Sequence, residues 1–94
     1  MRVRWLRAAR GNLEAELDYL AREDQDAAEK VYAHIMDRVA HLEKHPQAGR
    51  PGRVFGTREL VIERYPYIVP YRVRGDAVEI LRVFHTSRKP PEGW

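Results

Sequence analysis

The chain contains no cysteine, and this absence excludes several kinds of chemistry. A protein without cysteine has no disulfide framework, no thiol nucleophile and no thiolate metal site. Its four histidines are then the only soft metal ligands. Such a composition suits a reducing compartment, and we expect a cytoplasmic protein.

Long apolar runs are missing as well. The first ten residues mix arginine with apolar side chains and offer no stretch of the kind that a secretion signal requires. No segment approaches the roughly 18 consecutive apolar residues of a membrane span, so we expect no contact with a membrane. The length of 94 residues predicts one domain, 1–94, and excludes an enzyme with separate cofactor and substrate lobes.

Net charge is small, at +3, but it is unevenly distributed. Residues 1–11 carry +4, residues 12–45 carry −5 and residues 46–94 carry +4. If the two ends of the chain meet, they form a basic surface of about +8. Most of these bases are arginines, which suit bidentate contacts to phosphate or carboxylate. The alternative is that they only keep exposed strand faces solvated.

Apolar residues at helical spacing predict two helices. Leucines recur at i, i+4 and i+7 and indicate an amphipathic helix that begins at about Ala8 or Asn12 and ends at Glu23. Asp26, followed three residues later by Glu29, has the spacing of a capping box and predicts the start of a second helix. This helix is expected to end at His45, before a proline. A connection of two or three residues makes the pair an antiparallel hairpin.

Three later segments are rich in β-branched and aromatic residues, which favour strands: 54–63, 67–74 and 77–85. With an N-terminal strand at 3–6, the order β-α-α-β-β-β predicts a two-layer α+β domain, with the helix hairpin on one face of a mostly antiparallel sheet. Pro70 lies within the segment 67–74 and lacks the N–H that a strand ladder uses. We therefore expect a bulge or an interruption at this position.

Apolar side chains point to both faces of the last predicted strand. One face carries Val78, Ile80 and Phe84, and the other carries Leu81, Val83 and His85. One face meets the helices, and we expect the other to leave apolar groups uncovered for a partner protein. A short dimer contact or a curled sheet is the alternative.

Four segments together form a recognisable pattern. They are His45-Pro46 with Gly49-Arg50 behind it, Gly56 to Leu60, Tyr67 to Val73, and Val78 to His85. The pattern extends over nearly the whole chain and resembles the RelE/ParE superfamily of bacterial toxins, closest in its strands to ParE-like members. The resemblance implies the toxin half of a type II toxin–antitoxin module, neutralised in a hetero-oligomer by a cognate antitoxin.

The resemblance implies two alternative targets. ParE-like members inhibit DNA gyrase, whereas RelE-like members cleave messenger RNA on the ribosome through the ribose 2′-OH. The strand pattern and an incomplete set of acid and base residues favour the gyrase inhibitor. A metal-independent mRNA endonuclease is the main alternative, and a family member that has lost toxicity or only binds nucleic acid is a third.

His85 is the candidate general acid or base for RNA cleavage, because a histidine side chain titrates near neutrality. Arg58 and Arg82 are the cations that the phosphate would meet in that case. The alternative role for His85 is structural, as a hydrogen-bonded residue at the end of the sheet. The remaining histidines lack a third metal ligand at suitable spacing, so we expect no metal site and no cofactor.

Eight residues are candidates for contacts with the target or the antitoxin. They are Arg50, Arg53, Arg58, Tyr67, Tyr71, Arg82, Arg88 and Lys89. The cations suit phosphates or carboxylates, and the tyrosines suit stacking on bases. For Arg58 the alternative is an ion pair with Glu63 or Glu79, and for the tyrosines it is packing within the sheet.

Overall fold

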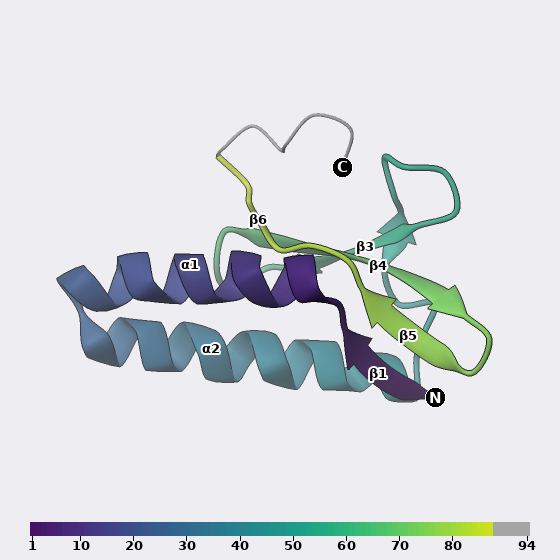
Figure 1. Cartoon of the computed structure of the whole chain (residues 1–94), viewed down its shortest axis with the longest axis horizontal. Helices are drawn as coiled ribbons and strands as arrows, with labels where there is room; N and C mark the ends of the chain where they lie inside the picture. The colour runs from purple at the N-terminus through teal and green to yellow at the C-terminus, as the bar shows by residue number, and fades with distance from the viewer. Residues whose placement is uncertain (88–94) are drawn as a thin grey trace.

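The chain folds into two helices packed against a mixed sheet (Figure 1). This computed structural model describes residues 1–87. Helix α1 (Arg7–Glu23) and helix α2 (Gln25–Ala40) lie side by side as an antiparallel hairpin, and a short 3-10 helix, η1 (His41–Glu43), follows α2. The predicted two-layer α+β architecture is confirmed.

The connection between the helices is a single residue, Asp24, in extended conformation with φ −159° and ψ 105°. Its side chain caps α2, because Asp24 Oδ1 accepts a hydrogen bond from the Ala27 N–H at 3.2 Å. The cap predicted at Asp26 is therefore wrong, and Asp26 instead lies in the first helical turn. The second helix also ends earlier than predicted, at Ala40 rather than at His45.

Six strands form the sheet. They are β1 (Arg2–Trp5), β2 (Arg50–Pro51), β3 (Arg58–Ile62), β4 (Tyr67–Arg74), β5 (Ala77–Ile80) and β6 (Phe84–His85). Their order is β1-β5-β4-β3-β2, and β6 also pairs with β4. β1 runs parallel to β5, and the other pairs among the described residues are antiparallel. The two basic ends of the sequence therefore do meet, in the pairing of β1 with β5.

Pro70 lies inside β4 without interrupting it, which corrects the prediction. β4 is continuous over 8 residues, and Pro70 faces Glu59 of β3 in the register. On its other side, the Pro70 carbonyl accepts the Leu81 N–H at 2.9 Å. The N–H that proline lacks would point to that same side, where β5 has ended and β6 has not begun. The interruption thus falls at residues 81–83, and the strand predicted over 77–85 is two strands.

The core lies between the helix hairpin and the inner face of the sheet. Ile35 of α2 and Val69, Val78 and Ile80 of the sheet are all 0% exposed. These residues come from the apolar stripe of α2 and from alternate positions of β4 and β5, as the sequence periods predict.

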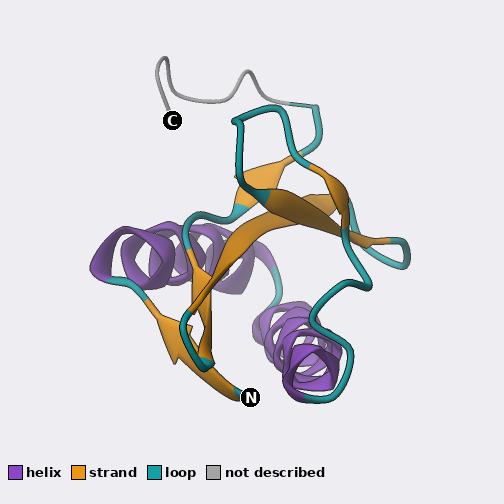
Figure 2. Cartoon of the chain, turned by 90° about the vertical axis from the view of Figure 1, so that its right-hand side faces the viewer, coloured by secondary structure: helices purple, strands orange, loops and turns teal. Residues whose placement is uncertain are grey.

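The prediction that the last strand leaves an apolar face uncovered is wrong. Leu81, Val83 and Phe84 are 7%, 4% and 7% exposed. Val83 belongs to the core, and its N–H donates to Asn12 Oδ1 of α1 at 3.1 Å. On the outer side, the guanidinium carbon of Arg53 lies 6.0 Å from the centre of the Phe84 ring. The strands curve around the helices (Figure 2), so the curled sheet accounts for the two-sided apolar pattern.

Candidate functional site

The sheet face that points away from the helices carries arginines on neighbouring strands. Arg4 of β1, Glu79 of β5 and Arg72 of β4 stand in one row of the register. Glu79 accepts a hydrogen bond from Arg72 Nε at 2.7 Å, and guanidinium nitrogens of Arg4 and Arg74 lie 3.7 and 4.0 Å from its carboxylate. Three arginines surround one carboxylate, so the row keeps an excess of positive charge. We call these four residues the Glu79 cluster.

The carboxylate of this cluster stays ionised. The hydrogen bond from Arg72 holds the pKa of Glu79 below its ordinary value, against a desolvation that would raise it. The charges of Arg74 and Arg4 act in the same direction as Arg72. The arginine side chains keep 36% to 67% of their area exposed, and so remain accessible to a negatively charged partner.

A second carboxylate, Glu59 of β3, organises the loop between β2 and β3. Glu59 is 3% exposed. It accepts hydrogen bonds from Arg50 Nη2 at 3.1 Å, from the Arg53 backbone N–H at 2.9 Å and from Arg53 Nε at 3.0 Å. Desolvation raises the pKa of Glu59, but the hydrogen bonds from Arg53 and Arg50 outweigh it and leave the pKa below its ordinary value. We call these residues the Glu59 cluster; it brings together Arg50 and Arg53, two of the predicted binding residues.

The loop over residues 52–57 carries a fully exposed aromatic ring at its tip. Phe55 is 103% exposed. Beneath it, the Gly52 N–H donates to the Thr57 carbonyl at 2.9 Å, and the N–H and hydroxyl of Thr57 donate to the Val54 carbonyl at 3.1 and 2.6 Å. Gly56 completes the turn with a φ of +80°. Sequence reasoning missed Phe55 by placing it in a strand; the two flanking glycines were the signal for a turn.

Tyr71 is 0% exposed and fixes the segment before β2. Its hydroxyl accepts the Gly49 N–H at 2.8 Å and donates to the Pro46 carbonyl at 2.8 Å. Burial raises the pKa of the Tyr71 hydroxyl, so it remains a neutral donor. The ring presents no face for base stacking in this conformation, and its role is packing.

Arg58 is held at the same segment. Its Nη1 donates to the Gly49 carbonyl at 2.8 Å and reaches the Gln47 carbonyl at 3.4 Å. The ion pair considered with Glu63 or Glu79 is not formed, since the guanidinium is directed to backbone carbonyls instead. Arg58 therefore adds a positive charge beside the Glu59 cluster.

The end of the sheet holds Tyr67 and His85 against each other. Their rings meet edge to face with centroids 5.4 Å apart. Tyr67 is 3% exposed, which favours packing over base stacking. His85 Nδ1 lies 3.2 Å from the Ser87 backbone N and 2.8 Å from the Ser87 hydroxyl. These contacts match a structural histidine at the sheet end.

Two of the candidate catalytic residues, His85 and Arg58, are not neighbours. Arg58 stands opposite Tyr71 and His85 stands opposite Tyr67, on the two sides of β4. Four residues of extended chain separate these positions by about 13 Å along the strand. Arg82 lies in the gap between β5 and β6, where its Nη1 donates to the carbonyl of the preceding residue at 2.7 Å. The structure therefore does not assemble His85 and Arg58 into one site.

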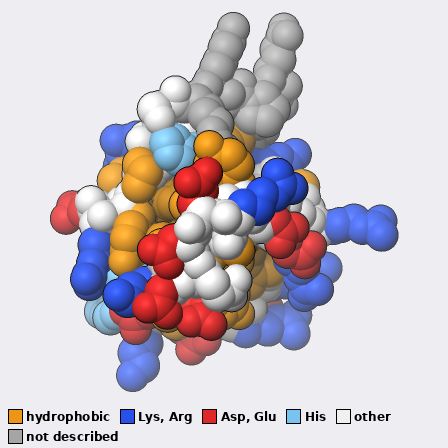
Figure 3. All heavy atoms as spheres, turned by 90° about the vertical axis from the view of Figure 1, so that its left-hand side faces the viewer, with side chains coloured by type: hydrophobic (Ala, Val, Ile, Leu, Met, Phe, Trp, Pro, Cys, Tyr) orange, Lys and Arg blue, Asp and Glu red, His pale blue; other side chains and the backbone are white. Residues whose placement is uncertain are grey.

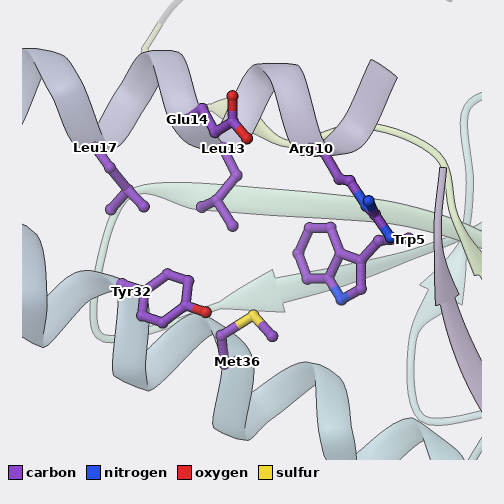
Figure 4. Close-up of a pocket in the computed structure, with 7 residues that line it drawn as sticks. All are labelled: Trp5, Arg10, Leu13, Glu14, Leu17, Tyr32 and Met36. Carbon is purple, nitrogen blue, oxygen red and sulfur yellow. The ribbon is translucent and has the colours of Figure 1, made fainter. Parts of the chain in front are cut away.

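A mostly apolar cavity of about 300 Å³ opens between the two helices and β1. It is lined by Trp5, Arg10, Leu13, Glu14, Leu17, Tyr32 and Met36 (Figure 4). Leucines reach down from α1, Tyr32 and Met36 reach up from α2, and Trp5 closes one end. The cavity suits an apolar side chain of a partner. Sequence reasoning missed it, although an aromatic residue within the apolar stripe of α2 was a usable signal.

Acidic side chains gather at the end of the hairpin where α1 and α2 connect (Figure 3). Glu23, Asp24 and Asp26 are all exposed there. The strands that carry the Glu79 cluster lie at the other end of the long axis (Figure 1). The charge separation of the sequence is thus a separation in space.

Two further properties concern residues 1–87. Within this range, no three histidine or acidic side chains are grouped closely enough to hold a metal ion. Neither helix of the range combines the length and the hydropathy needed to cross a membrane. The remaining predicted binding residues, Arg88 and Lys89, lie outside the described residues.

Comparisons with known proteins agree with this architecture. The family described as "ParE toxin of type II toxin-antitoxin system, parDE" matches residues 3–90. The candidate toxin Y4kP of Sinorhizobium fredii is 44% identical over 91 residues, which are 97% of this chain and 94% of the relative. A solved chain of the chromosomal ParDE toxin–antitoxin system from P. aeruginosa has a TM-score of 0.83 and 34% identity, over 93% of this chain and 97% of that chain. The chain belongs to the ParE family of toxins from type II toxin–antitoxin systems.

Proposed function

We propose that this ParE-family chain, acting as a single toxin domain in the cytoplasm, arrests growth by binding DNA gyrase, and that a cognate antitoxin neutralises it in a hetero-oligomer. Family membership supports the toxin role. The observation that carries the choice of target is the separation of His85 from Arg58, on opposite sides of β4. A protein inhibitor needs a binding surface, and this chain offers several.

RNA cleavage at the ribose 2′-OH needs a base, an acid and cations around one phosphate. Two of the three candidates are arginines, which would supply only cations, so His85 alone would have to act as the acid and the base. The Arg58 guanidinium donates to backbone carbonyls instead of facing His85. A nuclease site would therefore need a rearrangement, whereas inhibition by binding needs none.

The proposed antitoxin is supported by two surfaces with complementary chemistry. The cavity between the helices suits apolar side chains, and the Glu79 cluster suits carboxylates. A segment that carries both kinds of residue would bury apolar area and meet the excess positive charge. The relative from P. aeruginosa belongs to a ParDE system, which agrees with a partner of this kind.

Induced expression in a bacterial host tests the target. We expect double-strand breaks and an SOS response with intact messenger RNA, and loss of supercoiling when the purified toxin is added to gyrase. The variant His85→Ala should retain most of this activity, because the histidine contacts Tyr67 and Ser87 at the sheet end. Its unfolding midpoint serves as the control for folding. Cleavage of messenger RNA within translated codons, with undamaged DNA, would contradict the proposal.

A further inference from the structure

The loop between β2 and β3 presents the most exposed large apolar side chain of residues 1–87. Phe55 is 103% exposed, whereas Tyr19, Tyr32 and Val73 are 55%, 46% and 43% exposed. An exposed residue in a mobile loop would mean little, because single apolar residues are common on protein surfaces. Phe55 can serve as a binding residue only if the loop that carries it is firmly held.

The base of this loop is fixed from inside. The Arg53 backbone N–H and Arg53 Nε both donate to Glu59, at 2.9 and 3.0 Å, and Arg50 donates to the other oxygen at 3.1 Å. Thr57 closes the turn with two hydrogen bonds to the Val54 carbonyl. A Cβ atom at Gly52 would collide with the Thr57 side chain, so the turn is closely packed. Phe55 is thus presented by a preorganised loop, which lowers the entropy lost when a partner binds.

The chemistry at the loop indicates the kind of partner. Arg50 and Arg53 both pair with one carboxylate, Glu59, and Arg58 is held close by on the Gly49 carbonyl, so the base of the loop carries an excess of positive charge. These guanidinium groups donate to Glu59 and to backbone carbonyls, which holds them in place, and the side chains of Arg50 and Arg53 remain 54% and 42% exposed to a negatively charged partner. What the tip can still gain is burial of an aromatic ring. A protein pocket supplies this best.

We propose that Phe55 is the anchor with which the toxin binds its protein target, entering an apolar pocket that has carboxylates on its rim to face Arg50 and Arg53. This inference rests on the proposed function in taking gyrase as the target. The tip of the loop is distinct from the cavity between α1 and α2, so target and antitoxin contacts are separable.

The test compares full-length variants with wild-type toxin in a gyrase supercoiling assay and in direct binding to purified gyrase. Phe55→Ala should weaken both on the order of 30-fold, which corresponds to about 2 kcal/mol. Phe55→Leu keeps an apolar side chain and should restore part of the affinity. Tyr19→Ala is the matched control, because it removes an exposed aromatic ring from α1, and it should change neither measurement.

Two further readouts make the result specific. The two Phe55 variants should unfold at the wild-type urea concentration, since Phe55 is fully exposed, and should bind the cognate antitoxin as tightly as wild type does. Wild-type inhibition of gyrase by Phe55→Ala would overturn the inference. So would an unchanged affinity for gyrase combined with a weakened affinity for a short DNA duplex, which would assign the tip to nucleic acid.

Growth arrest in cells separates this inference from the proposed function. If the wild-type toxin fails to inhibit gyrase, the proposed target is wrong. Loss of growth arrest by a folded Phe55→Ala variant would then still support an anchor for another protein target. Full arrest by that variant would refute the anchor itself.

Discussion

Glu59 is a buried carboxylate held by two arginines, and this makes its contribution to stability depend on pH. Its pKa is lower in the folded chain than its ordinary value, because the hydrogen bonds from Arg53 and Arg50 outweigh desolvation. The contribution is therefore present above the unfolded-state pKa of about 4.3 and is lost as pH falls through the folded-state pKa. At pH 7, Glu59→Gln should lower the free energy of unfolding by about 1–2 kcal/mol. Urea unfolding followed by tryptophan fluorescence would measure it.

The free energy of unfolding of Glu59→Gln should lie closer to that of wild type in acid than at pH 7. As pH falls, wild type loses the contribution of ionised Glu59, so the difference between wild type and Glu59→Gln narrows. Glu29→Gln is a suitable control, because Glu29 is an exposed carboxylate on α2, outside both clusters. A deficit for Glu59→Gln that stays constant from neutral pH into acid would show that the charge of Glu59 does not hold the loop.

Single residues such as Glu59 and Tyr71 show where sequence reasoning stops. The sequence marks Arg50 and Arg53 as available cations, but their shared partner follows from the pairing of β2 with β3, which spans only 2 residues. Tyr71 belongs to a strand that was predicted with correct bounds. Its bond to Gly49 depends on where a loop 22 positions earlier returns to the sheet. Neither contact can be predicted from the residues that lie near it in the sequence.

The helix hairpin depends on a cap that competes with a neighbouring pattern. Asp24 accepts the Ala27 N–H, whereas Asp26 lies in the first turn of α2. Asp24→Ala should destabilise the chain by about 1 kcal/mol, since it leaves a helix N–H without its partner. Asp26→Ala should lower the free energy of unfolding by no more than about 0.3–1 kcal/mol, because it removes only a charge that interacts with the helix dipole. Urea midpoints of the two variants compare them directly, and a larger loss for Asp26→Ala would contradict the assigned cap.

The helices and strands differ in how far each can be predicted from its own residues. The 3.6-residue period of the leucines predicts α1 and its end at Glu23, because the residues of its packing face recur within its own sequence, but it leaves the start open between about Ala8 and Asn12, and the helix begins at Arg7. The strand predicted over 77–85 shows the opposite case. Its apolar pattern continues through residues 81–83, and the break there lies beside Pro70 of a different strand. A pattern within one segment does not contain that information.

At the scale of the whole molecule, the net charge is small, but the pairing of β1 with β5 helps to separate positive and negative side chains to opposite ends. It places Arg4 beside Glu79 and near Arg74, while the acidic residues of the hairpin connection lie at the other end. The sequence segments predicted this separation only on the condition that the two ends meet. The topology supplies that condition.

This charge separation should control how fast the proposed antitoxin associates. The Arg74 side chain is 67% exposed, so Arg74→Gln removes a positive charge that attracts carboxylates and changes little of the packing. We expect a several-fold slower association at low salt and little change in dissociation. The difference should fade in high salt, because the screening length falls from about 10 Å at 0.1 M to about 3 Å at 1 M. Arg22→Gln makes the same charge change at the end of α1 and should leave the rate close to wild type. Stopped-flow association at several salt concentrations measures both variants, and equal slowing by the two would show that only the net charge of the chain matters.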